Sequence, residues 1–78
     1  MIKGQKVRFI EPGVCGILYG NLTRGKVYRV TAGAGDALKS VQGGVGGGAG
    51  FEVRDDNGDY IYSRGLLGSL WGDWEIAP

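Results

Sequence analysis

The densest group of side chains that could do chemistry in this chain is residues 55–59, which read DDNGD. Acidic and amide side chains at alternate positions have the spacing that opens a calcium-binding loop. Such a loop also needs glycine at its sixth position and glutamate at its twelfth, where this chain has Tyr60 and Leu66. Asn57-Gly58 between two alternating runs is instead the strongest short-range signal for a β-hairpin. We therefore interpret the segment as a hairpin turn and predict no metal site.

A glycine tract is the second candidate for chemistry. Residues 43–50 read GGVGGGAG, with six glycines in eight positions, in a chain that has 17 glycines in all. Residues 44–49 match the G-x-G-x-x-A pattern of dinucleotide-binding loops. Such a loop follows a strand and opens a helix, whereas this one precedes a predicted strand. We therefore predict a flexible loop and no bound cofactor.

The nucleophiles of the chain lack the partners that catalysis needs. There is no histidine, so Ser40, Ser63 and Ser69 have no base of the kind that a hydrolase triad uses. Cys15 is the only cysteine and lies among apolar residues, where a small buried hydrophobe is expected. The carboxylates cluster in a solvated turn, where ordinary acidities are expected. We predict that the protein is not an enzyme.

The composition is that of one small globular domain, covering residues 1–78. Its hydrophobic fraction is 42%, and its net charge of +1 gives no strong attraction to nucleic acid or to an anionic membrane. The signs are unevenly distributed, because residues 1–40 hold seven Lys or Arg and two acids. No apolar run approaches the ~20 residues of a membrane span, and a lone cysteine fits reducing surroundings. We expect a soluble, cytoplasmic protein without a membrane partner.

Alternating polar and apolar residues predict short β-strands and no long helix. The strands are expected at residues 4–10, 26–31, 51–54, 60–62 and 74–76. The residues expected to face inward and form the core are Val7, Phe9, Tyr28, Val30, Phe51, Val53, Ile61, Trp74 and Ile76. The pattern predicts an all-β fold, a small barrel of about five short antiparallel strands.

Two apolar or glycine-rich segments between these strands are harder to assign. Residues 14–22 are expected to form a loop with a short strand, because two glycines interrupt their apolar run. Residues 32–50 form a long glycine-rich connector that we expect to be flexible. Within it, Asp36 could cap a helical turn over residues 37–41, or residues 38–42 could form a short strand. Connectors of this length are usually functional or disordered.

Binding residues are expected on the surface of the second long connector, residues 63–73, and beside it. Its sequence SRGLLGSLWGD is richer in leucine and tryptophan than a core of this size can absorb, and Trp and Tyr are enriched at binding hot spots. The candidate partner-binding residues are Trp71, Leu70, Leu67, Tyr60 and Tyr62. A second candidate is a basic stripe that is either a solvated sheet face or a nucleic-acid surface. Its residues are Lys6, Arg8, Lys26 and Arg29.

Three strand and turn segments together resemble the small SH3-like barrel proteins of tailed bacteriophages and prophages. They are LTRGKVYRV, GFEVRDDNGDYIYSR and a terminal WEIA. The resemblance covers about half of the chain, in residues 4–10, 22–31, 51–62 and 74–76. The resemblance implies an SH3-like barrel fold. It also implies a role as a small modulator that binds a host protein. The two long connectors depart from the family pattern, and the pattern offers no catalytic residue.

Three functions follow as hypotheses. The first is a non-enzymatic, phage-type accessory protein in the bacterial cytoplasm that binds and modulates a host or phage protein through the two long connectors. The second is a small barrel that binds nucleic acid through its basic stripe. The third is a structural, self-assembling virion component or homo-oligomer, because small barrels expose sheet edges that pair with another chain.

Overall fold

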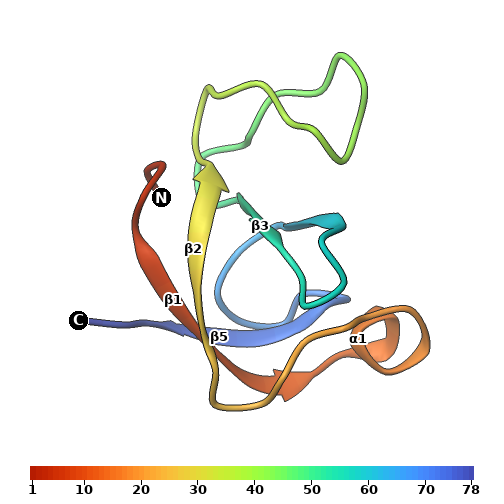
Figure 1. Ribbon diagram of the computed structural model, residues 1–78. Helices are drawn as coiled ribbons and strands as arrows, with labels where there is room; N and C mark the ends of the chain where they lie inside the picture. The colour runs from red at the N-terminus through yellow and green to blue at the C-terminus, as the bar shows by residue number, and fades with distance from the viewer.

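The computed structural model describes all 78 residues and contains one five-stranded antiparallel sheet (Figure 1). The strands follow the order β4-β3-β2-β1-β5, so the last strand pairs with the first. The elements are β1 (Lys6–Pro12), α1 (Val14–Leu18), β2 (Val27–Ala32), β3 (Phe51–Arg54), β4 (Tyr60–Ser63) and β5 (Gly72–Ile76). The predicted all-β barrel of five short antiparallel strands is confirmed. No helix is long and apolar enough to cross a membrane.

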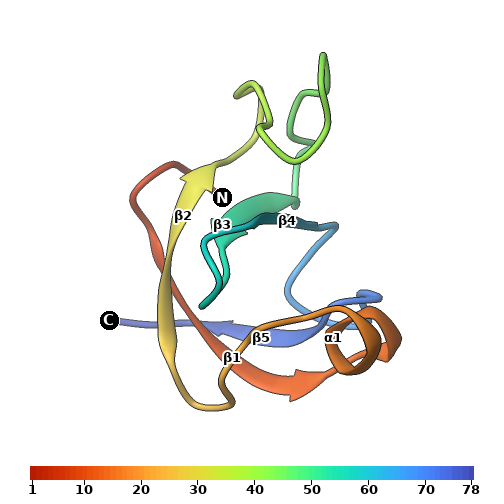
Figure 2. The same ribbon diagram turned by 45° about the vertical axis from the view of Figure 1, so that its right-hand side comes forward.

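The sheet curls because β2 takes part in two halves of it. The first half of β2 pairs with β1, where Tyr28 faces Val7, and the second half pairs with β3, where Val30 faces Val53. The β2–β3 register shifts after Val30, and the β1–β5 register shifts after Phe9. Irregularities of this kind bend a strand and increase its twist. The sheet therefore wraps around its own inner face as a half-barrel (Figure 2).

Trp74 stands at the centre of the core. Its ring meets three other rings edge-on, with centroid distances of 4.9 Å to Phe9, 5.3 Å to Phe51 and 5.8 Å to Tyr28. Such aromatic pairs contribute about 0.5–1.5 kcal/mol each beyond the area that they bury. The buried core cluster is Val7, Phe9, Tyr28, Val30, Phe51, Val53, Ile61 and Trp74. These are eight of the nine residues predicted from the alternation.

Ile76, the ninth, was predicted wrongly, because 47% of it is exposed. It faces Val7 in the β1–β5 register, but it is the last residue of an edge strand. The chain places Ala77 inside instead, and the Ala77 N–H donates to the Lys6 carbonyl. The alternation therefore identified the strand but not where its buried part ends.

Residues 14–18 form the short helix α1, so the expected loop with a short strand is wrong there. The backbone N–H of Ile17 donates to the Gly13 carbonyl and that of Tyr19 to the Cys15 carbonyl, at 2.9 and 2.8 Å. The first turn is fixed from outside, since the Cys15 N–H donates to the Leu70 carbonyl at 2.8 Å. This helix buries none of its own residues.

The connector between β2 and β3 is the loop at the top of Figure 1, and it folds back on itself like a hairpin. Ala37 and Val45 form an isolated antiparallel bridge, and the Leu38 N–H donates to the Gly44 carbonyl at 2.9 Å. Neither the helical turn nor the strand weighed for this segment forms. Asp36 instead accepts a hydrogen bond from the Gly33 N–H through its carboxylate. The flexibility of residues 32–50 stays a prediction.

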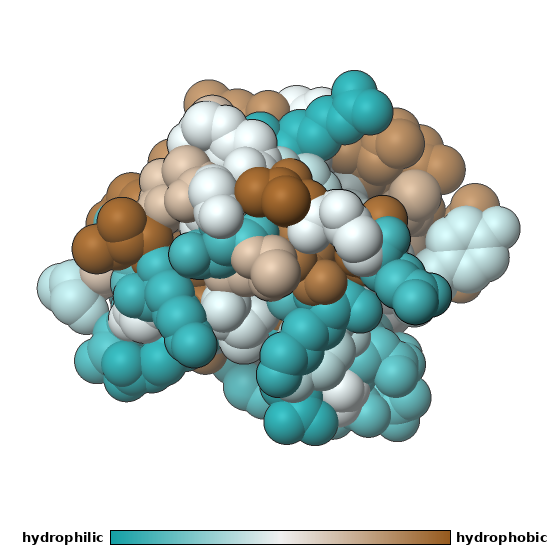
Figure 3. Space-filling model, turned by 90° about the horizontal axis from the view of Figure 1, so that it is seen from above, coloured by the Kyte–Doolittle hydropathy of each residue, from teal (hydrophilic) through white to brown (hydrophobic).

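Two side chains on the outer face of the sheet hold this connector down. Glu52 and Tyr62 are neighbours in the β3–β4 register. The fully buried Glu52 carboxylate accepts hydrogen bonds from the backbone N–H groups of Lys39 and Ser40, at 2.9 and 2.8 Å. The Tyr62 hydroxyl accepts one from the Gly47 N–H at 2.9 Å. Seen from above, the face that carries the connector shows separate hydrophobic clusters among hydrophilic residues (Figure 3).

The glycine tract lets two backbone segments of the connector approach each other closely. The Gly46 N–H donates to the Asp36 carbonyl at 2.9 Å, and the Gly35 N–H donates to the Gly46 carbonyl at 3.0 Å. A Cβ atom at position 46 would overlap the carbonyl oxygen of Gly33. A Cβ atom at Gly48 would meet nothing. Glycine is therefore required for steric reasons at some positions of the tract, such as Gly46, but not at others, such as Gly48.

Candidate functional site

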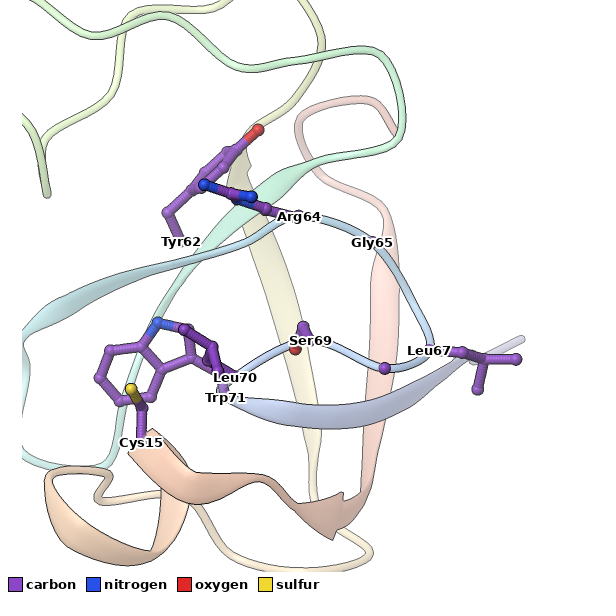
Figure 4. Close-up of a pocket in the computed structure, with 9 residues that line it drawn as sticks. Cys15, Tyr62, Arg64, Gly65, Leu67, Ser69, Leu70 and Trp71 are labelled. Carbon is purple, nitrogen blue, oxygen red and sulfur yellow. The ribbon is translucent and has the colours of Figure 1, made fainter.

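A groove of about 360 Å³ opens beside the connector between β4 and β5 (Figure 4). Four of the five predicted partner-binding residues line it together, namely Tyr62, Leu67, Leu70 and Trp71. The other lining residues are Cys15, Arg64, Gly65, Gly68 and Ser69. The structure thus gathers at one place residues from β4, the 64–71 connector and α1.

The groove has an aromatic and sulfur-lined side and a polar side. Figure 4 shows the Trp71 indole next to the Cys15 sulfur on one side, with Tyr62 and Arg64 across the opening. Trp71 is partly buried and packs against the core, so its ring is anchored. Leu67 points away from the other side chains. Cys15 is half-buried in the groove wall, so the prediction of a fully buried residue is wrong.

Hydrogen bonds within the connector and between the connector and β5 fix the shape of the groove. The connector is tied to β5 where the Trp74 N–H donates to the Leu66 carbonyl at 2.6 Å and the Gly68 N–H donates to the Asp73 carboxylate at 2.8 Å. The Ser69 hydroxyl donates to the Gly72 carbonyl, which closes the turn before β5. A wall held in this way loses little conformational freedom when a ligand binds.

Exposed apolar side chains lie on the two segments that contribute to the groove lining, the connector and α1. The connector contributes Leu67 and Leu70, which are 78% and 67% exposed. The helix α1 and the residue after it contribute Val14, Ile17, Leu18 and Tyr19, all exposed. Single apolar residues on a surface need no explanation, but contiguous apolar patches on small proteins mark interaction sites. Sequence reasoning missed the α1 part, although the apolar run of residues 14–19 was a usable signal.

Tyr60, the fifth predicted residue, lies elsewhere. Its ring has the Lys39 ammonium and the Arg54 guanidinium each 5.3 Å from its centroid, within the range of cation–π attraction. It lines a second concave site with Lys39 and does not line the groove. The structure therefore divides the predicted partner-binding set between two places.

The predicted basic stripe is interrupted by ion pairs. Arg8 pairs with Glu75 at 2.8 Å, and Lys26 pairs with Asp56. Lys6 and Arg29 face each other in the β1–β2 register, and neither forms an ion pair with a carboxylate. Two of the four predicted cations are thus already neutralised. The expected stripe is not continuous.

The Asp56 carboxylate accepts hydrogen bonds from three side chains. It accepts hydrogen bonds from Lys26, from the Thr23 hydroxyl at 2.6 Å and from the Tyr28 hydroxyl at 3.0 Å. The hydrogen bonds from Lys26 and then Thr23 lower the pKa of Asp56 below its usual range. The same hydrogen bond raises the pKa of Lys26, whereas burial is the largest cause that raises the pKa of Tyr28. This cluster ties the hairpin turn to the loop before β2.

The serine hydroxyls that sequence analysis considered as nucleophiles are used in the fold. Ser40 donates to Glu52, Ser63 donates to the Gly65 carbonyl, and Ser69 donates to the Gly72 carbonyl. No three histidine, cysteine or acidic side chains are placed so that they could hold a metal ion. The arrangement around the groove offers apolar contact, one thiol and one cation. These are the means of binding another molecule.

Comparison with known proteins gives no relative to argue from. No family model, no curated protein and no solved structure matches this chain.

Proposed function

We propose that this protein is a non-enzymatic binding module that holds a segment of another protein in the groove beside Trp71. The observation that carries the proposal is the exposed apolar surface next to this groove, on the connector and on α1, whose Val14, Ile17 and Leu18 are all exposed. A chain of 78 residues can bury only about 60% of the surface that it exposes when unfolded, so its stability depends on burying as many large apolar side chains as possible. Six of the eleven exposed large apolar side chains lie on the connector, on α1 and on the residue after it, and a partner that covers this surface explains their grouping best.

The groove has the features of a binding hot spot. Trp71 provides a large ring at its inner side, and Leu70, which also lines the groove, is largely exposed. Tryptophan and tyrosine dominate binding energies because they bury much area at a low entropic cost. A volume of about 360 Å³ accommodates one or two large side chains of a partner. The groove therefore fits an apolar anchor of a protein better than a whole folded surface.

Arg64 indicates the charge of the partner. It lines the groove and forms no ion pair and no hydrogen bond within the chain. An arginine guanidinium pairs well with a carboxylate through two parallel hydrogen bonds. We therefore infer an apolar segment that carries an acidic residue next to its anchor. The resemblance to small phage barrels supports a bacterial host or phage protein as its source and the bacterial cytoplasm as its location.

Cys15 allows a direct test, because it is the only thiol of the chain and lines the groove. Immobilised protein is used to capture proteins from a bacterial lysate, and the captured protein is then purified and mixed with the free barrel. The expected result is slower alkylation of Cys15 by a maleimide in the complex. Unchanged alkylation would place the partner elsewhere and overturn the proposal.

Two matched variants separate the groove from general stickiness. Leu70→Asp puts a charge on the groove rim, and Val41→Asp puts the same charge on an exposed valine of the other long connector. Capture should be lost with the first variant and kept with the second. Equal capture by both would contradict the proposal. Light scattering on the free barrel tests whether the protein forms a homo-oligomer. Dimers that form with rising concentration and that also slow the alkylation of Cys15 would show that a second copy of this chain occupies the groove.

A further inference from the structure

A second concave site of about 280 Å³ lies apart from the groove, on the outer face of the sheet. Lys3 and Gly4 from the N-terminal segment form one part of it, and Lys39 from the glycine-rich connector forms another. The rest comes from the sheet, as Arg29, Val30, Thr31 and Tyr60. No residue is shared with the groove beside Trp71.

The site is positively charged and has no carboxylate in its lining. Lys3, Arg29 and Lys39 line it, and none of them belongs to the three ion pairs of the molecule. The Arg29 guanidinium only approaches the Gly4 carbonyl, at 3.4 Å. Arg29 also faces Lys6 across β1 and β2, and like charges directly opposite each other destabilise a sheet. An anion bound here would remove that repulsion.

Glu52 lies beneath this site, where it accepts a hydrogen bond from the lining residue Thr31, but it forms no ion pair with the cations. Glu52 is fully buried beneath the connector, and its Oε2 atom already accepts hydrogen bonds from two backbone N–H groups and the Ser40 hydroxyl. Its Oε1 atom accepts one from the Thr31 hydroxyl. The carboxylate is therefore occupied by the connector, while the cationic groups around Tyr60 face outward.

An aromatic ring stands among the cations. Tyr60 has Lys39 and Arg54 each 5.3 Å from its ring centroid, and it shares the second site with Arg29. Proteins that bind single-stranded nucleic acid combine cations along the phosphate backbone with aromatic rings on which bases stack. A duplex keeps its bases stacked inside, so an aromatic ring among cations suits a single strand, whose base would take the place of the Lys39 ammonium over the ring while that lysine moves to a phosphate.

We propose that this outer face binds single-stranded nucleic acid, with Lys3, Arg29 and Lys39 at successive phosphates and Tyr60 against a base. Lys6, which is opposite Arg29, and Arg54, which lies over the Tyr60 ring, extend the same cationic surface. The site differs from the basic stripe predicted from the sequence, because it excludes the ion-paired Arg8 and Lys26. It shares no lining residue with the protein-binding groove, so either proposal can fail alone.

The test measures binding of a fluorescently labelled oligothymidylate, about 12 nucleotides long, by anisotropy between about 25 and 200 mM salt. Three phosphate contacts predict that log K falls against log[salt] with a slope of about −2. Arg29→Gln and Lys39→Gln should each weaken binding and reduce the slope by about 0.7. Tyr60→Leu should weaken binding without changing the slope, because stacking releases no counterions.

Arg24→Gln is the matched control, since it removes the same charge from an exposed arginine that is paired with Glu11. It should change neither affinity nor slope, and circular dichroism verifies that every variant is folded. Equal weakening by Arg24→Gln and Arg29→Gln would show unspecific charge attraction and overturn the site. Absence of binding at the lowest salt would do the same. Tighter binding of a duplex, or equal binding of tripolyphosphate, would overturn the single-stranded ligand.

Discussion

Glu52 gives the sharpest prediction about the fold, because one carboxylate joins the long connector to the barrel. It is fully buried on the outer face of β3, and its Oε2 atom accepts three hydrogen bonds, from the Lys39 N–H, the Ser40 N–H and the Ser40 hydroxyl, at 2.9, 2.8 and 2.7 Å. Removing it would leave two backbone donors of the connector without their acceptor. The connector would then lose its main attachment between residues 38 and 46.

The magnitude follows from the number and type of these bonds. Hydrogen bonds to a charged group contribute about 1.5–3 kcal/mol each, but bonds that share one acceptor are not additive. We expect Glu52→Ala to lower the free energy of unfolding by about 3–5 kcal/mol. A domain of this size has only about 4–12 kcal/mol in total, so this variant risks unfolding. Glu52→Gln keeps an acceptor oxygen and the side-chain shape, and should cost about 1–2 kcal/mol.

The assay is urea unfolding followed by Trp fluorescence, together with amide hydrogen exchange of Lys39 and Ser40. Glu52→Gln should lower the unfolding midpoint and speed exchange at these two amides more than in the core strands. Ser40→Ala removes one of the shared bonds, so the double variant should be less destabilised than the sum of both singles. Glu75→Gln makes the same chemical change at an exposed ion pair and should cost less than about 1 kcal/mol. Equal effects of Glu52→Gln and Glu75→Gln, with unchanged exchange at Lys39 and Ser40, would refute this reasoning.

Two further predictions concern the glycine tract and acid stability. Gly46→Ala should destabilise the protein by about 1–3 kcal/mol, because its Cβ would overlap the Gly33 carbonyl. Gly48→Ala places its Cβ in open space and should stabilise the protein by about 0.4–1 kcal/mol. Urea midpoints that rank the two variants in the opposite order would be inconsistent with a close approach at Gly46. The pKa of Asp56 is lowered by folding, so its contribution to stability is complete above its ordinary value of 3.8 and is lost as the pH falls through the folded value. Near neutral pH the Asp56→Asn variant should therefore have a free energy of unfolding about 1–2 kcal/mol lower than that of the parent protein. This difference in free energy should shrink at pH 3. A difference that stays constant with pH would show that the carboxylate is not its cause.

The strands and the core were predictable because the information for them is local. Alternation alone identified Val7, Phe9 and Val53 as inward-facing, and the Asn57-Gly58 pair located the β3–β4 turn. Each of these inferences needs only a few neighbouring residues and the two-residue period of a strand. Alternation does not predict at which residue of a strand burial by the rest of the fold ends, as the exposed Ile76 at the end of β5 shows.

The connector could not be predicted in the same way, because its contacts are remote in sequence. Glu52 reads as a polar residue in an alternating strand, and only the folded chain brings Lys39 and Ser40 over it. The ion pairs that divide the basic stripe join residues far apart, such as Arg8 and Glu75. The groove was partly foreseen, since Trp71 and its neighbours lie in one short segment, but its α1 wall was not.

The glycine-rich connector links both proposed sites. Tyr62 lines the groove with its ring, while its hydroxyl accepts a hydrogen bond from Gly47 in the glycine tract. At the other end of the same hairpin-like loop, the two backbone bonds to Glu52 position Lys39 beside Tyr60. If the cationic face binds phosphate as proposed, the connector that carries the glycine tract contributes to that binding through Lys39 and not through a phosphate-binding loop. Because one segment supports a residue of each site, a change in its packing would reach the groove and the cationic face together.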